Sequence, residues 1–280
     1  MILEKTDKNY WDSCWQDADI PSIVNPHITG IRNYNNRKLH QYFSQVLSGR
    51  NTKELKLLEI GCARSTWLPY FAKEFGFNVC GLDYSEIGCK QAKAILSNSN
   101  IEGDIVCTNF FQPPDNLIEA FDVVVSFGVV EHFEDTAQCI SAFSKFLKPN
   151  GIIITIIPNM VGLMGWTQKI FNKPVFDIHM PLDLKLLTNA HEVVGFKNLN
   201  SCYLLSLDFG VCNLNGLDTR KNLTKIKGFI IRNLSRFSKI IWLIEKYLKE
   251  FTPNKTWSPN IVFAGTKKAD IFQSRSVKHF

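Results

Sequence analysis

Two carboxylates, Glu59 and Asp83, stand at the ends of two short apolar runs, 56–60 and 77–82. Gly61 and other small residues follow the first run, an order that predicts a buried strand, a tight turn and a helix N-terminus. Ligands of open α/β sheets bind beyond the carboxyl ends of the strands. A glycine allows close approach of the backbone to a ligand, and a carboxylate about 20 residues later accepts ribose hydroxyls. The pattern therefore predicts a nucleoside cofactor.

The glycine pattern disfavours a dinucleotide. In the G-x-G-x-x-G fingerprint the three positions would be Gly61, Ala63 and Thr66, and only the first is a glycine. A pyrophosphate requires the second glycine for close approach of the backbone. We therefore expect a nucleoside with a smaller tail, and an NAD-linked enzyme is the less favoured alternative.

His132 is the candidate for a general base or for a group that orients an acceptor. It comes shortly after the near-continuous apolar run 121–126, and its ordinary pKa suits proton transfer near neutral pH. The alternative is a structural histidine that holds its loop by hydrogen bonds, with Glu131 as an orienting group. His179 is the second catalytic candidate. No Cys/His cluster has the spacing of a zinc site, so no metal is expected.

A doubly wound, mostly parallel sheet must position these residues, because runs of strand length alternate with amphipathic segments of helix length. We expect seven strands, at 56–60, 77–82, 104–108, 121–126, 152–157, 199–205 and 260–266. We expect helices at 36–49, 66–75, 85–97, 134–147 and 181–194. Residues 1–35 and 160–180 show poor helical patterning, and 148–151 has the composition of a turn. The aromatic residues within 1–35 predict either an arm on the domain surface or a flap over the cofactor.

About 50 residues separate the last two expected strands. They predict one amphipathic helix, or two broken near Gly228. The expected apolar face consists of Leu223, Ile226, Ile230, Leu234, Phe237, Ile241, Ile244 and Leu248. The opposite face carries Lys225, Lys227, Arg232, Arg236, Lys239 and Lys246. A cap docked through the apolar face, with a solvated basic face, is the first interpretation. Peripheral contact with an anionic membrane and a homodimer through 222–250 are the alternatives.

Composition is that of an ordinary soluble protein. The 280 residues carry 32 Lys and Arg against 26 Asp and Glu, and the net charge of +6 does not demand a nucleic-acid partner. The eight cysteines form no C-x-x-C pair, and the N-terminus has no apolar signal region, so we expect reduced thiols and a cytoplasmic protein. The expected organisation is an N-terminal arm and helix (1–50), a cofactor-binding core (51–205), a helical insertion (206–258), and a final strand with a tail (259–280).

Four motifs occur in a recognisable order and spacing. They are LLEIGCARS (57–65), GLDYSE (81–86), FDVVVSFGVVEHFED (121–135) and LKPNGIIITIIPN (147–159). Together they resemble the class I S-adenosylmethionine-dependent methyltransferases, in particular the small-molecule branch that carries Glu-His after the fourth strand. The resemblance implies a Rossmann-like fold and S-adenosyl-L-methionine as cofactor. It implies methyl transfer to a small-molecule or lipid-like acceptor, through oxygen, nitrogen or carbon. An inactive binding scaffold is the alternative.

The resemblance also implies which residues contact the cofactor. Glu59 and Gly61 would line its amino-acid end, and Asp83 would bind the ribose hydroxyls. Tyr84 and Phe110 would sandwich the adenine. The remaining expected contacts are Cys62, Ala63 and Ser65 in the first turn, Asn109 near the adenine amino group, and Phe127, Gly128 and Val129 beside the sulfonium. Because the Glu-His pair occurs in family members with different acceptors, the structural interpretation of His132 is slightly favoured.

Overall fold

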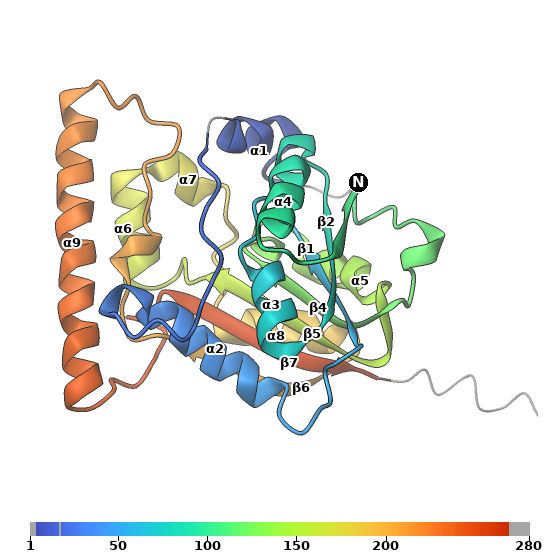
Figure 1. Cartoon of the computed structure of the whole chain (residues 1–280). Coiled ribbons are helices and arrows are strands. Elements are labelled where there is room, and N and C mark those ends of the chain that lie inside the picture. Colours follow the sequence, from blue (N-terminus) through green and yellow to red (C-terminus); the bar gives the residue numbers. More distant parts are fainter. Residues whose placement is uncertain (1–3, 17, 269–280) are drawn as a thin grey trace, which may run out of the picture.

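The computed structural model describes residues 4–16 and 18–268. A seven-stranded sheet in the order β3-β2-β1-β4-β5-β7-β6 crosses the molecule, and β7 runs antiparallel to the other six strands (Figure 1). The strands are β1 (Lys56–Ile60), β2 (Asn78–Asp83), β3 (Gly103–Cys107), β4 (Phe121–Phe127), β5 (Leu147–Pro158), β6 (Phe196–Leu204) and β7 (Asn260–Lys267). The predicted α/β fold with a doubly wound sheet is confirmed.

Helices cover both faces of this sheet. One face packs against α2 (Tyr34–Val46), α3 (Trp67–Phe75) and α4 (Glu86–Asn98), and the other against α5 (Thr136–Ser144) and α8 (Leu184–Val193). Side chains alternate between the faces because successive residues of a strand point in opposite directions. Val123 and Val125 of β4 therefore enter one hydrophobic core and Val124 the other. This arrangement explains why the central strand is an unbroken apolar run.

Three segments differ from the sequence-based expectation. A helix, α1 (Lys8–Trp15), forms in the N-terminal arm, where Asp7 caps it by accepting a hydrogen bond from the amide of Tyr10. Residues 160–180 contain α6 (Leu163–Phe171) and α7 (Lys173–Asp177). The expected turn at 148–151 lies within the bounds of β5, where Asn150 has a positive φ of 63°. The helices α1, α6 and α7 are short, so tertiary contacts decide their formation more than their weak apolar periodicity does.

Short 3-10 turns complete the chain at η1 (Ile31–Asn33), η2 (Asp115–Leu117), η3 (Val130–His132) and η4 (Phe209–Val211).

The insertion between β6 and β7 forms one continuous helix, α9 (Asn222–Tyr247), which stands at one side of the molecule (Figure 1). Gly228 lies inside it and does not break it. The helix docks on the domain as expected, but only Leu234 and Ile241 of the expected apolar face pack against a buried cluster. Its buried residues are Thr224, Ile231, Ser238, Trp242 and Glu245. Most of the expected docking face is exposed, including Leu223, Ile226, Ile230, Phe237, Ile244 and Leu248.

Polar anchors hold α9 in place. The indole Nε1 of Trp242 donates to the carbonyl of Leu207 (2.7 Å), and its ring stacks on Tyr34. The hydroxyl of Tyr34 donates to Glu245 (3.0 Å). The hydroxyl of Ser238 accepts from the amide of Phe209 (3.0 Å). In the part of the chain that the structure describes, every helix is too short or too polar to cross a membrane.

We expect Trp242→Ala to lower the free energy of unfolding by about 3 kcal/mol, because it removes a large buried ring and a buried hydrogen bond. Urea denaturation followed by circular dichroism measures this change. Ile240→Ala, on the exposed side of the same helix, is the matched control and should change stability by less than about 0.5 kcal/mol. Equal effects of the two substitutions would contradict the observed orientation of α9.

Candidate functional site

A cavity of about 270 Å³ opens where β1, β2 and β4 end. The turn after β1 reaches it through Gly61, whose φ is 78°. A Cβ at this position would lie 2.5 Å from Cγ2 of Val129, which is closer than side chains pack. Only a glycine therefore allows the turns after β1 and β4 to approach each other here.

Glu59 lies in the wall of this cavity and is almost completely buried. The hydroxyl of Ser65 donates to its Oε2 (2.6 Å), and the same hydroxyl accepts from the amides of Trp67 and Leu68 at the start of α3. Burial raises the pKa of Glu59 to about 8. The carboxyl group is thus largely protonated at neutral pH unless a cation binds beside it.

Asp83 joins the first two strand ends. Its Oδ2 accepts from the amide of Ala63 (2.9 Å) and its Oδ1 from the amide of Ser85 (2.8 Å). Burial raises the pKa of the Asp83 carboxyl above its ordinary value. A carboxylate oxygen has more than one acceptor site, so Asp83 retains acceptor capacity for a ligand in the cavity that it lines.

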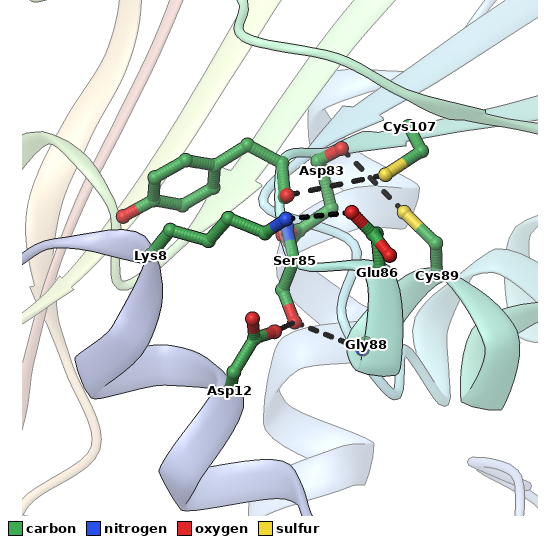
Figure 2. Close-up of polar contacts among 9 residues, drawn as sticks. Lys8, Asp12, Asp83, Ser85, Glu86, Gly88, Cys89 and Cys107 are labelled. Atoms are coloured by element: carbon green, nitrogen blue, oxygen red, sulfur yellow. Dashed lines mark hydrogen bonds and ion pairs between the residues drawn. The ribbon is translucent and has the colours of Figure 1, made fainter.

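The N-terminal arm closes one side of the cavity. Figure 2 shows α1 against the first turn of α4, where Ser85 accepts from the amide of Gly88 and donates to Asp12 (2.5 Å). Lys8 pairs with Glu86 at 2.8 Å in the same view. These contacts bring Trp11 and Trp15 into the cavity wall.

Glu4 and Thr6, which precede α1, also line the side of the cavity that the arm closes. The hydroxyl of Tyr84 donates to Glu4 (2.7 Å), and both side chains line the cavity together with Thr6. The arm is therefore more than a surface attachment. Of the two interpretations of residues 1–35, the geometry of the described part favours a flap over the site.

His132 lies beyond the end of β4, in η3, and is 4% exposed. A neutral imidazole here donates through Nδ1 to the carbonyl of Ile178 (2.8 Å), which makes Nε2 the acceptor. Burial, and next the nearby His179, lower the pKa of His132 to about 3. The side chain is thus uncharged at neutral pH, and it lines the cavity in edge-to-face contact with the ring of Trp11.

Glu131, His132 and His179 form a cluster that the sequence did not predict. One potential ligand atom from each residue lies within 4.8 Å of the others. Neither carboxylate oxygen of Glu131 has a hydrogen-bond partner among the described residues, and burial raises the pKa of Glu131 to about 8. Carboxylate and imidazole groups bind divalent cations, so these three side chains could hold one. The sequence spacing did not indicate a metal site, because His179 lies in the loop after α7, far along the chain from Glu131 and His132.

The structure brings most of the predicted site residues to one cavity. The predicted residues in its wall are Glu59, Gly61, Ala63, Ser65, Asp83, Tyr84, Phe110, Phe127, Gly128, Val129 and His132. Cys62 is buried, and Asn109 is exposed and accepts from the amide of Phe111 (2.9 Å); neither is part of that wall, nor is His179. The prediction omitted Glu4, Thr6, Arg64, Thr66, Trp67, Leu82 and Phe133, which also line the cavity.

The residues present fit S-adenosylmethionine. Glu59 would supply a carboxylate for its ammonium group, and Asp83 would supply acceptors for its ribose hydroxyls, since both line the cavity. Tyr84 and Phe110 offer aromatic surface for a purine. The close contact at Gly61 leaves no space for a larger residue beside the ligand. This combination of side chains suits a nucleoside that carries an amino acid.

Comparison with known proteins agrees with this chemistry. A family model described as a methyltransferase domain matches residues 30–199, which is more than half of the chain. The ubiquinone biosynthesis O-methyltransferase of Rhodopseudomonas palustris is 28% identical over 159 residues, which cover 56% of this chain and 60% of that protein. The protein of the same name from Rickettsia canadensis is 27% identical over 243 residues, covering 80% and 88% of the two chains.

The fold comparison extends over most of the chain. The structure of geranyl diphosphate C-methyltransferase from Streptomyces coelicolor, in complex with Mg2+, geranyl diphosphate and S-adenosyl-L-homocysteine, has a TM-score of 0.58 at 13% identity. The match covers 93% of this chain and 97% of that one. With the family model, the sheet order and the fitted cavity in agreement, the chain belongs to the class I S-adenosylmethionine-dependent methyltransferases.

Proposed function

We propose that this chain transfers a methyl group from S-adenosylmethionine to an oxygen atom of a small-molecule acceptor. One observation carries the proposal: the carboxyl side chains of Glu59 and Asp83 line the same cavity as His132, whose Nε2 is an available acceptor. The name that the curated relatives share, O-methyltransferase, supports oxygen as the methylated atom.

The cofactor, when bound, supplies an electrophilic methyl group on a cationic sulfur. In our proposal Glu59 pairs with its ammonium group and Asp83 accepts hydrogen bonds from its ribose. Trp11 and Trp15 of the arm exclude water from the cavity that they line. Holding the reactants in place and keeping water out are the main tasks of the protein in such a transfer.

His132 would accept a hydrogen bond from the acceptor hydroxyl through Nε2. Its strongly lowered pKa makes the imidazole too weak a base to deprotonate the free hydroxyl, so it first orients that group. As the S–CH3 bond breaks and the O–CH3 bond forms, the methylated oxygen becomes far more acidic than an imidazolium, and Nε2 takes its proton and passes it to solvent when the product leaves. The neutral form is an advantage here, because a cationic imidazolium would be repelled by the sulfonium of the cofactor. Glu131 lies beside it without a partner among the described side chains.

S-adenosylhomocysteine should raise the melting temperature of the wild-type protein, and NAD should not. At about 100 times the dissociation constant, linkage gives roughly 2.7 kcal/mol of stabilisation. Differential scanning fluorimetry measures the shift. Asp83→Ala should lose most of it, whereas Asp122→Ala, which removes a carboxylate at the start of β4 outside the cavity wall, should keep it. A full shift in Asp83→Ala would contradict the assignment.

Binding of S-adenosylhomocysteine should tighten as the pH rises from about 6.0 to about 7.5. Burial raises the pKa of Glu59 to about 8, so the free protein holds a proton there that an incoming ammonium group must displace. Affinity should increase by roughly tenfold per pH unit over that window, with proton release detected by titration calorimetry in buffers of different ionisation enthalpy. Glu59→Gln should bind weakly and without this pH dependence. A pH-independent affinity in the wild type would rule out the pairing.

His132→Ala should lower the turnover of a phenolic acceptor by roughly two orders of magnitude, while binding of S-adenosylhomocysteine remains. Transfer of a radiolabelled methyl group to catechol, with an aliphatic amine as the nitrogen-containing comparison, measures the reaction. His40→Ala is the control, because His40 lies in α2 outside the cavity wall. A loss below tenfold would assign His132 a structural role, and methylation of the amine alone would exclude the oxygen acceptor.

A further inference from the structure

The outward side of α9 carries a row of exposed apolar side chains that Asn233 interrupts at its centre. Phe229 is 62% exposed and Ile240 is 56% exposed. We call the following six residues the outer face: Ile226, Phe229, Phe237, Ile240, Ile244 and Tyr247. At 100° per residue, they all lie within an arc of about 80° on the helix circumference. An exposed apolar surface of this extent usually marks a binding site.

The helix cannot rotate to bury its outer face against the domain, because its opposite side is already fixed there. The buried residues Thr224, Ile231, Ser238 and Glu245 recur every seven positions on the opposite side of the helix. Hydrogen bonds from Trp242 to Leu207 and from Tyr34 to Glu245 hold that side against the domain. Turning the outer face inward would break these buried bonds, at a cost of about 1–3 kcal/mol for each polar group left without a partner.

A basic edge runs along one side of the outer face. Lys225, Arg232, Arg236 and Lys246 are exposed, and none forms a salt bridge with a carboxylate of the described residues. The sequence of α9 contains six Lys and Arg against a single acid, Glu245, which is buried. The helix therefore carries a charge of +5, out of +6 for the whole chain.

We propose that α9 lies flat on the surface of a bilayer that contains anionic lipid. Its outer face enters the boundary between headgroups and acyl chains, and its basic edge contacts the lipid phosphates. An exposed apolar face bordered by lysine and arginine is the pattern of interfacial helices. Each basic residue near such a surface contributes about 1 kcal/mol. This attachment goes beyond methyl transfer and does not depend on it.

Charge argues against a second copy of this chain as the occupant. Two α9 helices packed through their outer faces would bring together two elements of charge +5. The helix offers no exposed carboxylate that could pair with the partner's lysines and arginines. An anionic surface satisfies both the apolar face and the basic edge, whereas self-association satisfies only the first.

The test is co-sedimentation of the full chain with vesicles. We expect binding to phosphatidylcholine vesicles that contain about 30% phosphatidylglycerol at about 50 mM salt, weakening as salt screens the charges. Binding to phosphatidylcholine alone should be at least about tenfold weaker. No binding to the anionic vesicles, or equal binding to both, would overturn the proposal.

Substitutions separate the two parts of the surface. Phe229→Ser with Phe237→Ser should reduce vesicle binding at least tenfold through lost apolar burial. Lys225→Glu with Arg236→Glu should reduce it roughly 100-fold. The matched control, Leu186→Ser with Val193→Ser, changes two exposed apolar residues of α8 and should bind like the wild type. Circular dichroism verifies that each variant is folded.

Two further outcomes would overturn the proposal. If the Phe229 and Phe237 variant bound vesicles as well as the α8 control, the outer face would not be the contact surface. Sedimentation equilibrium without lipid is the second measurement. A stable dimer that the Phe229 and Phe237 substitutions convert to monomer would assign the outer face to a second copy instead.

Discussion

The carboxylate of Asp83 holds the candidate site together. It accepts from the amide of Ala63 in the turn after β1 and from the amide of Ser85 before α4, so one buried anion continues the connection between the paired strands β1 and β2 into the turns that follow them. Because buried carboxylates are stable only when hydrogen-bonded, the two turns and the charge depend on one another. The close contact between Gly61 and Val129 then brings the end of β4 to the same place.

Three titratable groups of the site other than Asp83 favour their neutral forms before a ligand binds. Burial raises the pKa values of Glu59 and Glu131 to about 8 and lowers that of His132 to about 3. All three groups therefore favour their neutral forms near pH 7. A cationic ligand reverses this preference for a neighbouring carboxyl group. The arm adds apolar surface to the same site, since Trp11 and Trp15 form part of the cavity wall.

The cavity and the outer face of α9 depend on different kinds of interaction. The cavity relies on buried, hydrogen-bonded groups held by rigid strand ends. The outer face of α9 relies on exposed apolar and basic side chains that the domain leaves without partners. That helix is attached by the hydrogen bonds of Trp242 and Glu245 and by Ile231, which is buried in a hydrophobic cluster, and none of these residues belongs to the outer face. The proposed membrane contact therefore places no demand on the packing of the core.

The sequence by itself determined the sheet, because buried parallel strands must be apolar runs and their order along the chain follows from alternation with helices. It also indicated most residues of the cavity wall, since strand ends such as Glu59 and Asp83 converge at one edge of a parallel sheet. It could not show that His179 lies beside His132, which depends on the path of a loop. Nor could it orient α9. Periodicity identifies an apolar face, but the contacts of Trp242 and Ser238 with the domain leave most of that face exposed.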